Sequence, residues 1–162
     1  RRYKLTKKYH KELSKIYGFE NSNILKYNYL TYKINKLKKN GKFIVVLHIR
    51  RKDYKTWNNG IFYFSDQFYN NVINDLKSIL ISDNYDPFFI AVSDEKINPI
   101  IEVDLFSNRS WICDQMILQA CDLIIGPPST FTMWASYISK IPIIRLGYDQ
   151  NLSLKNSTIC SG

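Results

Sequence analysis

The stretch that decides the fold is residues 43–54, which read Phe-Ile-Val-Val-Leu-His-Ile-Arg-Arg-Lys-Asp-Tyr. Its apolar start is typical of a buried β-strand, and it breaks directly into Arg50 and Arg51, followed by Asp53. Such a strand carries cations to the carboxyl edge of a sheet, where open α/β sheets bind ligands. Because a guanidinium donates two hydrogen bonds at once, the pattern favours a phosphate ligand. The alternative is a surface arginine pair that Asp53 neutralises.

A second stretch, residues 122–135, also reads as strand, tight turn and helix. Residues 123–125 are apolar and mostly β-branched, as in a buried parallel strand. The Gly-Pro-Pro turn that follows ends the strand, and Ser129 or Thr130 stands at or near the N-cap of the next helix. A helix start presents free N–H groups and a partial positive charge, so it suits an anion. The alternative is an ordinary Ser/Thr N-cap.

Strands and helices alternate along the remaining chain. The expected strands are 43–47, 87–92, 103–106, 123–125 and 141–146, and the expected helices are 64–81, 110–120 and 130–139, with a short helical turn at 98–101. This alternation predicts the α/β class, with a Rossmann-like parallel sheet flanked by helices. The candidate ligand-binding residues then all follow strand ends: His48, Arg50, Asp94 and Ser129.

Three ordered blocks resemble those of the α-1,2-fucosyltransferases, whose broader relatives are the α-1,6- and protein O-fucosyltransferases. The blocks are His-Ile-Arg-Arg-x-Asp-Tyr at 48–54, Ala-Val-Ser-Asp at 91–94 and Ser-Thr-Phe-Thr-x-Trp-Ala at 129–135. The resemblance spans residues 43–146 and implies the donor-binding half of a GT-B-type fold. It also implies a fucosyltransferase that moves L-fucose from GDP-fucose to a glycan hydroxyl, with inversion and without a metal or other cofactor.

The chain departs from the usual family pattern inside each block. Lys52 stands where glycine is usual, and Glu95 replaces the second acid after Ser-Asp. Pro127-Pro128 replaces the usual entry to the third block, and Met133 replaces its first tryptophan. These departures bear on the linkage and the donor sugar more than on phosphate binding.

Carried over by position, the resemblance makes Arg50 the catalytic residue, which contacts the β-phosphate and stabilises the departing GDP. Arg51 supports it, His48 lies near the nucleotide, and Asp94 contacts the base or the ribose. The phosphate-facing turn comprises Ser129, Thr130 and Phe131. All seven residues are therefore expected to bind the donor.

Two further residues, Asp53 and Tyr54, are expected to support this site. Asp53 is a candidate base for an acceptor hydroxyl, but pairing with a neighbouring arginine makes it a weak base, so we interpret it as a residue that orients arginine. Asp114 either reaches the site or only adds negative charge to the first turn of its helix. The sequence thus identifies no catalytic base.

Glycosyl transfer fits this set of residues. Negative charge grows on the leaving diphosphate, and a cation already aimed at it is favoured in the transition state. The sequence contains no Asp-x-Asp motif, no histidine or cysteine cluster with metal-ligand spacing, and only two histidines. Gly-x-Ser-x-Gly, Gly-x-Gly-x-x-Gly and Walker A motifs are also absent. Phosphate recognition is therefore expected to rest on arginine side chains and a helix start.

Charge and length suggest three segments. Residues 1–41 form a basic helical N-terminal segment, with helices expected at 5–17 and 24–37; residues 42–150 form the nucleotide-sugar-binding domain, and residues 151–162 form a C-terminal tail. The length suits a single domain, so an acceptor-binding half is expected to be missing or supplied elsewhere, and the chain alone is expected to bind more readily than to catalyse.

The net charge of +9 is concentrated in the N-terminal segment. Its basic face suits a nucleic acid, an anionic membrane surface or plain solvent. No nucleic-acid-binding motif accompanies it, so no nucleic acid is expected, whereas peripheral membrane contact is a hypothesis. No transmembrane run and no signal peptide are visible, which predicts a cytoplasmic or peripheral membrane location, or the lumen of the Golgi or ER for a eukaryotic fragment.

An aromatic loop lies between the first strand and the helix over 64–81. Trp57, Phe62 and Tyr63 either stack on a sugar or base, or cover the sheet edge as local core. Three other functions remain open beside fucosyl transfer. They are transfer from another nucleotide sugar, non-catalytic binding of a nucleotide or glycan, and nucleic-acid binding by the basic surface.

Overall fold

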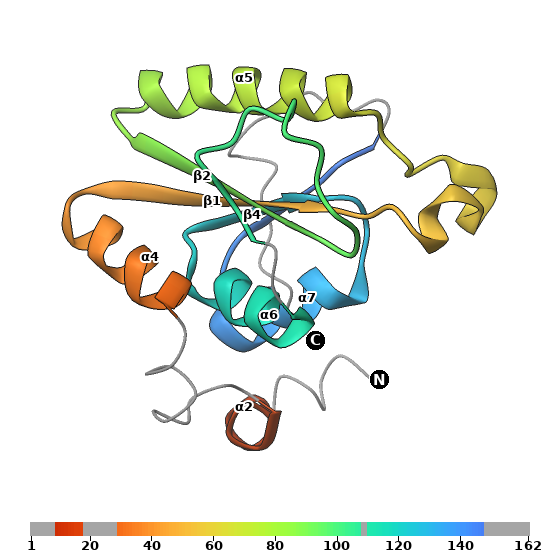
Figure 1. Cartoon of the computed structure of the whole chain (residues 1–162). Coiled ribbons are helices and arrows are strands. Elements are labelled where there is room, and N and C mark those ends of the chain that lie inside the picture. Colours follow the sequence, from red (N-terminus) through yellow and green to blue (C-terminus); the bar gives the residue numbers. More distant parts are fainter. Residues whose placement is uncertain (1–8, 18–28, 108–109, 148–162) are drawn as a thin grey trace.

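Residues 9–17, 29–107 and 110–147 are described by the computed structural model, and within them five parallel strands form one sheet (Figure 1). The strands are β1 (Lys42–Ile49), β2 (Asp86–Ser93), β3 (Leu105–Phe106), β4 (Leu123–Gly126) and β5 (Ile143–Arg145). Their order is β3-β2-β1-β4-β5, so the chain builds outward from β1 first to one edge and then to the other. The predicted α/β class with a Rossmann-like parallel sheet is therefore confirmed.

Helices cover both faces of the sheet. One face carries α5 (Asp66–Ser82), and the other carries α4 (Tyr29–Lys39), α6 (Trp111–Ala120) and α7 (Thr130–Ser139) (Figure 1). The short helix α2 (His10–Tyr17) lies beyond α6 and α7, and the His10 Nε2 atom is 2.8 Å from the Tyr137 carbonyl oxygen.

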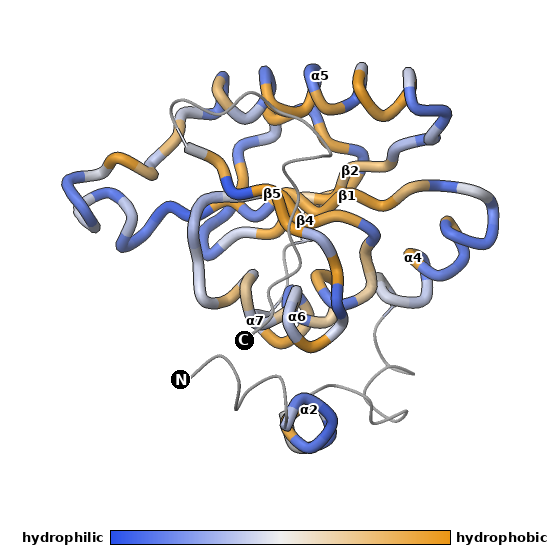
Figure 2. The backbone as a smooth tube through the Cα atoms, turned by 180° about the vertical axis from the view of Figure 1, so that it is seen from behind, coloured by the Kyte–Doolittle hydropathy of each residue, from blue (hydrophilic) through white to orange (hydrophobic). Residues whose placement is uncertain are grey.

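The core has two layers because strand side chains alternate between the two faces. From β1, Val45, Leu47 and Ile49 belong to the cluster beneath α5, whereas Ile44 and Val46 belong to the cluster beneath α4, α6 and α7. Figure 2 shows the resulting hydrophobic strands in the middle of the molecule. This alternation continues past the strand end and decides where the two arginines point.

Several predicted boundaries are wrong in detail. The predicted helical turn at 98–101 is a hydrogen-bonded turn, closed by the Ile101 N–H and the Asn98 carbonyl oxygen at 3.1 Å. Only Leu105–Phe106 of the strand expected at 103–106 pairs with β2, and β5 comprises Ile143–Arg145 instead of 141–146. Edge strands pair on one side only, so apolar character alone overestimates their length.

Other predictions hold closely. The helix at 130–139 has the predicted bounds, and β1 continues two residues beyond the apolar run, which brings His48 into the sheet. Gly126 lets β4 pass close to β1 at this point. A Cβ atom on Gly126 would lie 2.7 Å from the His48 carbonyl oxygen, a distance that real side chains do not tolerate.

The two predicted N-terminal helices are described in part. α2 lies within the predicted helix 5–17. α4 overlaps the predicted helix 24–37 and continues two residues beyond it, to Lys39. Residues 1–8 and 18–28 lie outside the described part. The tail at 151–162 lies outside it too. Ile34 of α4 is buried in the same cluster as the sheet. None of the helices in the described part has the length and apolar character that a membrane crossing needs.

Candidate functional site

Arg50 lies directly beyond β1, next to the point where the strand order reverses between β1 and β4. Its Nη2 donates to Asp53 Oδ1 at 2.5 Å, and its Nη1 is 3.2 Å from Asp94 Oδ2. The guanidinium carbon also lies 5.1 Å from the centre of the Tyr54 ring. Both supporting residues expected from the sequence, Asp53 and Tyr54, thus contact Arg50, and Asp94 anchors it from the end of β2.

The two carboxylates hold Arg50 with different firmness. The Asp94 side chain is 13% exposed, whereas that of Asp53 is 58% exposed and therefore free to move away. Arg50 Nε has no hydrogen-bond partner. Nε is buried, so an anion that displaces Asp53 would first meet Nη2.

Arg51 points to the opposite face of the sheet, toward α5. Its guanidinium donates to the Phe64 carbonyl oxygen and to the Asp66 carboxylate. Its backbone N–H donates to Asp94 Oδ1 at 2.9 Å. Arg51 thus orders the start of α5 and the backbone beside Arg50, while its charged group lies away from Arg50's side of the sheet.

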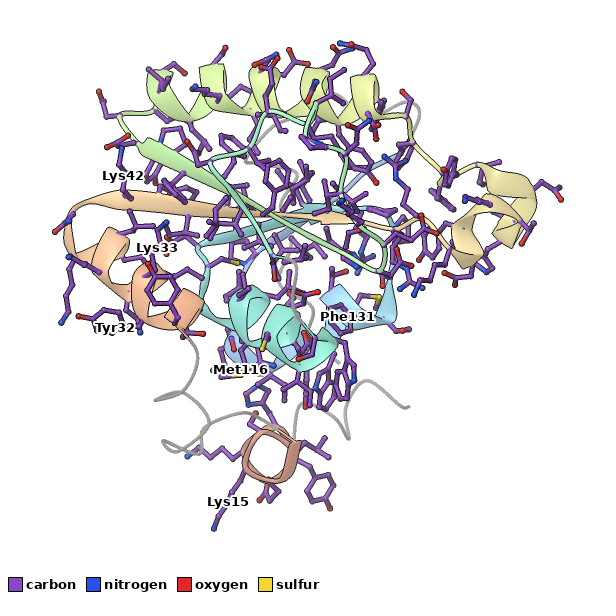
Figure 3. All side chains as sticks on the ribbon, in the orientation of Figure 1. Lys15, Tyr32, Lys33, Lys42, Met116 and Phe131 are labelled. Atoms are coloured by element: carbon purple, nitrogen blue, oxygen red, sulfur yellow. The ribbon has the colours of Figure 1, made fainter. Side chains whose placement is uncertain are left out.

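His48 is buried, on the face that carries α6 and α7. Its ring centre lies 5.6 Å from that of Phe131, which is located at the start of α7 (Figure 3). Burial, assisted by the Arg50 charge, lowers the pKa of His48 to about 3, so the ring is neutral at physiological pH. Its Nδ1 atom has no hydrogen-bond partner. Because this atom is buried and unpaired, it carries a desolvation cost.

The turn before α7 is fixed to its surroundings by hydrogen bonds. Ser129 is the N-cap, and its hydroxyl oxygen accepts from the Phe131 N–H at 3.2 Å, as one of the two sequence interpretations expects. The Tyr54 hydroxyl donates to the Pro128 carbonyl oxygen, and Gln115 Nε2 donates to the Phe131 carbonyl oxygen at 3.0 Å. The loop after β1 and the turn after β4 are therefore joined through Tyr54.

A pocket of about 420 Å³ opens beside these groups, and we call it the Arg50 pocket. Four of the residues expected to bind the donor line it: His48, Arg50, Asp94 and Phe131. Three others, Lys52, Ser93 and Trp111, had no role in the site expected from the sequence, and the fourth, Asp114, was left open between the site and the first turn of its helix. Ser129 and Thr130 lie next to Phe131 but do not line the pocket, and neither does Arg51.

Asp114 is the most informative addition. It lies in the first turn of α6, is buried, and accepts a hydrogen bond from the Ser107 hydroxyl. Burial raises the pKa of Asp114 to about 6, although the bond from Ser107 counteracts this shift. The sequence showed an acid in this turn but not its direction. Trp111, the first residue of α6, also lines the pocket and is 66% exposed. Nothing in its local sequence marked it as a residue of the site.

Among the described residues, no three His, Cys, Asp or Glu side chains gather as a metal ion would require. A search of family models gives no match to this chain, and neither do searches of curated proteins and of solved structures. The fold and the site therefore define only a class. The chain is a Rossmann-like α/β protein with a polar pocket at the carboxyl ends of its central strands.

Proposed function

We propose that the Arg50 pocket binds a nucleoside diphosphate sugar and that the protein is a glycosyltransferase. The main support is Arg50, whose Nη1 is anchored by part-buried Asp94, while a phosphate can replace exposed Asp53 at Nη2. The resemblance to α-1,2-fucosyltransferases makes GDP-fucose the proposed donor and a glycan hydroxyl the proposed acceptor. On this proposal the chain corresponds to the donor-binding half of a GT-B-type enzyme.

In the proposed reaction, the bond between the anomeric carbon and the diphosphate oxygen breaks as the acceptor oxygen attacks from the opposite side. The electron pair leaves with the diphosphate, and the proton of the acceptor hydroxyl passes to solvent water. Arg50 stabilises the charge that develops on the leaving oxygen, because its guanidinium is already oriented before the reaction begins. Lys52, which lines the same pocket, adds a second positive charge.

The rest of the Arg50 pocket suits the nucleobase of the donor. Trp111 offers an exposed ring for stacking, and neutral His48 lies on an aromatic partner, Phe131. Asp114 offers carboxylate oxygens, which accept both the N1–H and the N2 amino donors of guanine. Adenine, uracil and cytosine do not present this pair of donors. Asp114 therefore favours a guanine nucleotide, consistent with GDP-fucose.

Calorimetric titration of the chain with GDP, GMP, UDP and ADP tests the proposal, with and without EDTA. We expect GDP to bind most tightly, with no effect of EDTA, and removal of the β-phosphate to weaken binding roughly 10-fold or more. Since protonation turns one Asp114 oxygen into a donor, the carboxyl can no longer accept at both oxygens, and the preference for GDP over ADP should decline as the pH falls below about 6.

Three variants locate the binding. Arg50→Ala should abolish GDP binding, and Arg50→Lys should weaken it, because lysine keeps the charge but lacks the planar fork. Lys77 is an exposed residue of α5, so Lys77→Ala is the matched control and should bind GDP as the parent does. Unchanged GDP binding by Arg50→Ala would show that the site is wrong. Equally weak binding of all four nucleotides would remove the support for catalysis by this chain.

The second candidate function is non-catalytic binding of the same ligands. It is favoured by Asp94, whose carboxylate is occupied by Arg50 Nη1 and by the Arg51 backbone N–H and is therefore not free to act as a base. Mixing the chain with GDP-fucose and glycan acceptors and measuring released GDP separates the two functions. Binding without turnover would favour the non-catalytic module, and preference for UDP would favour a transferase with another nucleotide sugar.

A further inference from the structure

A second pocket, of about 370 Å³, opens on the opposite face of the sheet, and we call it the Arg51 pocket. It lies between the end of β1, the start of α5 and the loop that follows β2. The nucleotide proposed to bind Arg50 does not occupy the Arg51 pocket. Its lining combines a polar wall with an apolar floor, and this combination indicates the kind of ligand.

The polar wall carries carboxylate and amide groups. Asp66 is held by Arg51 and by Asn98, whose Nδ2 donates to Asp66 Oδ2 at 3.0 Å. Glu95 is less constrained, because the Lys55 ammonium lies 3.9 Å from its Oε1 atom and both side chains are well exposed. Glu95 therefore has carboxylate oxygens to offer a ligand, and fixed Asp66 and Asn98 add directional acceptors and donors.

The floor and one side are apolar. Ile97 and Ile101 are buried beneath the pocket, and Tyr63 forms part of its lining with 36% of its surface exposed. The guanidinium carbon of Arg51 lies 5.2 Å from the centre of the Tyr63 ring, and this cation–π contact positions the ring. An apolar ligand would leave the polar wall unsatisfied, and the lining carries charges of both signs, Arg51 and Lys96 beside Asp66 and Glu95, so it singles out neither an anion nor a cation. A sugar ring suits both surfaces, because it has hydroxyl groups at its rim and C–H groups on its faces.

The two pockets meet at the sheet edge. Ser93, the last residue of β2, lines both of them, and the consecutive residues Arg50 and Arg51 line one each. Ligands in the two pockets would thus approach the carboxyl ends of β1 and β2 from opposite sides.

We propose that the Arg51 pocket binds a neutral monosaccharide unit of the glycan acceptor. The role as acceptor rests on the proposed transferase function, whereas the binding of sugar rests on the pocket itself. Tyr63 packs against a face of the sugar ring, and Glu95 and Asn98 hydrogen-bond to its hydroxyl groups. The acceptor hydroxyl then lies at the shared edge near Ser93, beside the donor in the Arg50 pocket.

Saturation-transfer NMR of the full chain tests this, with methyl hexopyranosides of gluco, galacto and manno configuration as probes and inorganic phosphate as the anionic comparison. We expect at least one glycoside to bind and phosphate not to compete with it. Tyr63→Ala and Glu95→Gln should each weaken this binding roughly 10-fold. The matched controls are Tyr85→Ala, at the opposite end of the sheet, and Glu102→Gln, an exposed acid outside the pocket.

Circular dichroism and the unfolding midpoint of each variant check that it folds, and a GDP titration of each variant separates the two proposals. Loss of glycoside binding in Tyr63→Ala with GDP binding retained supports the proposal. Intact GDP binding with no glycoside binding overturns it and leaves the proposed function standing. Glycoside binding that depends on Tyr63 without any GDP binding keeps the sugar site and overturns the transferase function. Binding that is lost in Trp57→Ala but kept in Tyr63→Ala would place the sugar on the exposed aromatic loop, contrary to the proposal.

Discussion

At the residue scale, the Arg50 pocket contains two titratable groups that burial drives toward their neutral forms. For His48 the neutral form is the deprotonated one, and its pKa falls to about 3. For Asp114 the neutral form is protonated, and its pKa rises to about 6. The two shifts have opposite effects on how the free energy of unfolding depends on pH.

The sign follows from which state binds more protons. Between about pH 6.5 and 3 the unfolded chain protonates His48 and the folded chain does not, so His48 lowers stability as the pH falls. Between about pH 6 and 4 the folded chain protonates Asp114 and the unfolded chain does not, so Asp114 raises stability as the pH falls. The two contributions therefore oppose each other over most of this range.

Asp114→Asn should remove one of them. We expect the variant to be more stable than the parent at about pH 7, and to lose more stability on acidification to about pH 5, each by the order of 1–3 kcal/mol. Urea unfolding at the two pH values measures both effects. His48→Gln should show the opposite change: it should lose less unfolding free energy on acidification than the parent does. Parallel pH profiles for Asp114→Asn and the parent would contradict the assigned burial of this carboxyl.

At the element scale, the site depends on how closely β1 and β4 approach each other. Gly126 at the end of β4 permits that approach, because its absent side chain leaves room for the His48 backbone. The same contact sets the position of the turn before α7 and hence of Phe131.

Gly126→Ala should therefore harm both stability and binding. The added Cβ would meet backbone atoms that cannot rotate away, so we expect a loss of about 1–3 kcal/mol in unfolding free energy and weaker GDP binding. Gly147→Ala is the matched control, since its Cβ would have nothing within 4 Å. Urea unfolding and calorimetry measure the two effects. Equal results for the two alanine variants would show that the close approach carries no cost.

At the scale of the whole molecule, charge is distributed unevenly around the sheet. The outward side of α4 carries two exposed tyrosines and two exposed lysines in helical register: Tyr29, Tyr32, Lys36 and Lys39. Figure 3 shows Tyr32 on this helix, on the side that faces away from α5. Tyrosine and lysine together suit the surface of an anionic bilayer. We propose that this face makes the peripheral membrane contact that the sequence raised as a hypothesis.

Vesicle sedimentation tests that contact. The chain should bind vesicles that contain phosphatidylserine but not pure phosphatidylcholine, and salt should weaken the binding. Lys36→Glu should reduce it several-fold, because each lysine near such a surface contributes about 1 kcal/mol. Lys77→Glu makes the same charge change on the opposite helix layer and should have little effect. Binding of duplex DNA instead of vesicles, with the same dependence on Lys36, would contradict the membrane assignment.

Much of the fold could be predicted because the signals are local. Apolar runs predicted β1, β2 and β4, and the helix periodicity predicted α5, α6 and α7 to within a few residues. Edge structure was predicted less well, as the short β3 and the turn at 98–101 show, because edge segments depend on neighbours that the local pattern does not reveal.

For the candidate site, the sequence by itself placed Arg50 and Asp94 just beyond strand ends, but it assigned both Arg50 and Arg51 to the donor, whereas the two guanidinium groups lie at opposite faces of the sheet. Only the tertiary structure decided that Asp114 and Trp111 enter the Arg50 pocket and that Arg51 belongs to a second pocket. Asp114 and Trp111 are some sixty positions from Arg50 along the chain. Arg51 is adjacent to Arg50, but its guanidinium contacts residues at the start of α5. Their positions depend on how α6 packs across the sheet, and packing between distant segments leaves no pattern within the few residues that a local signal spans.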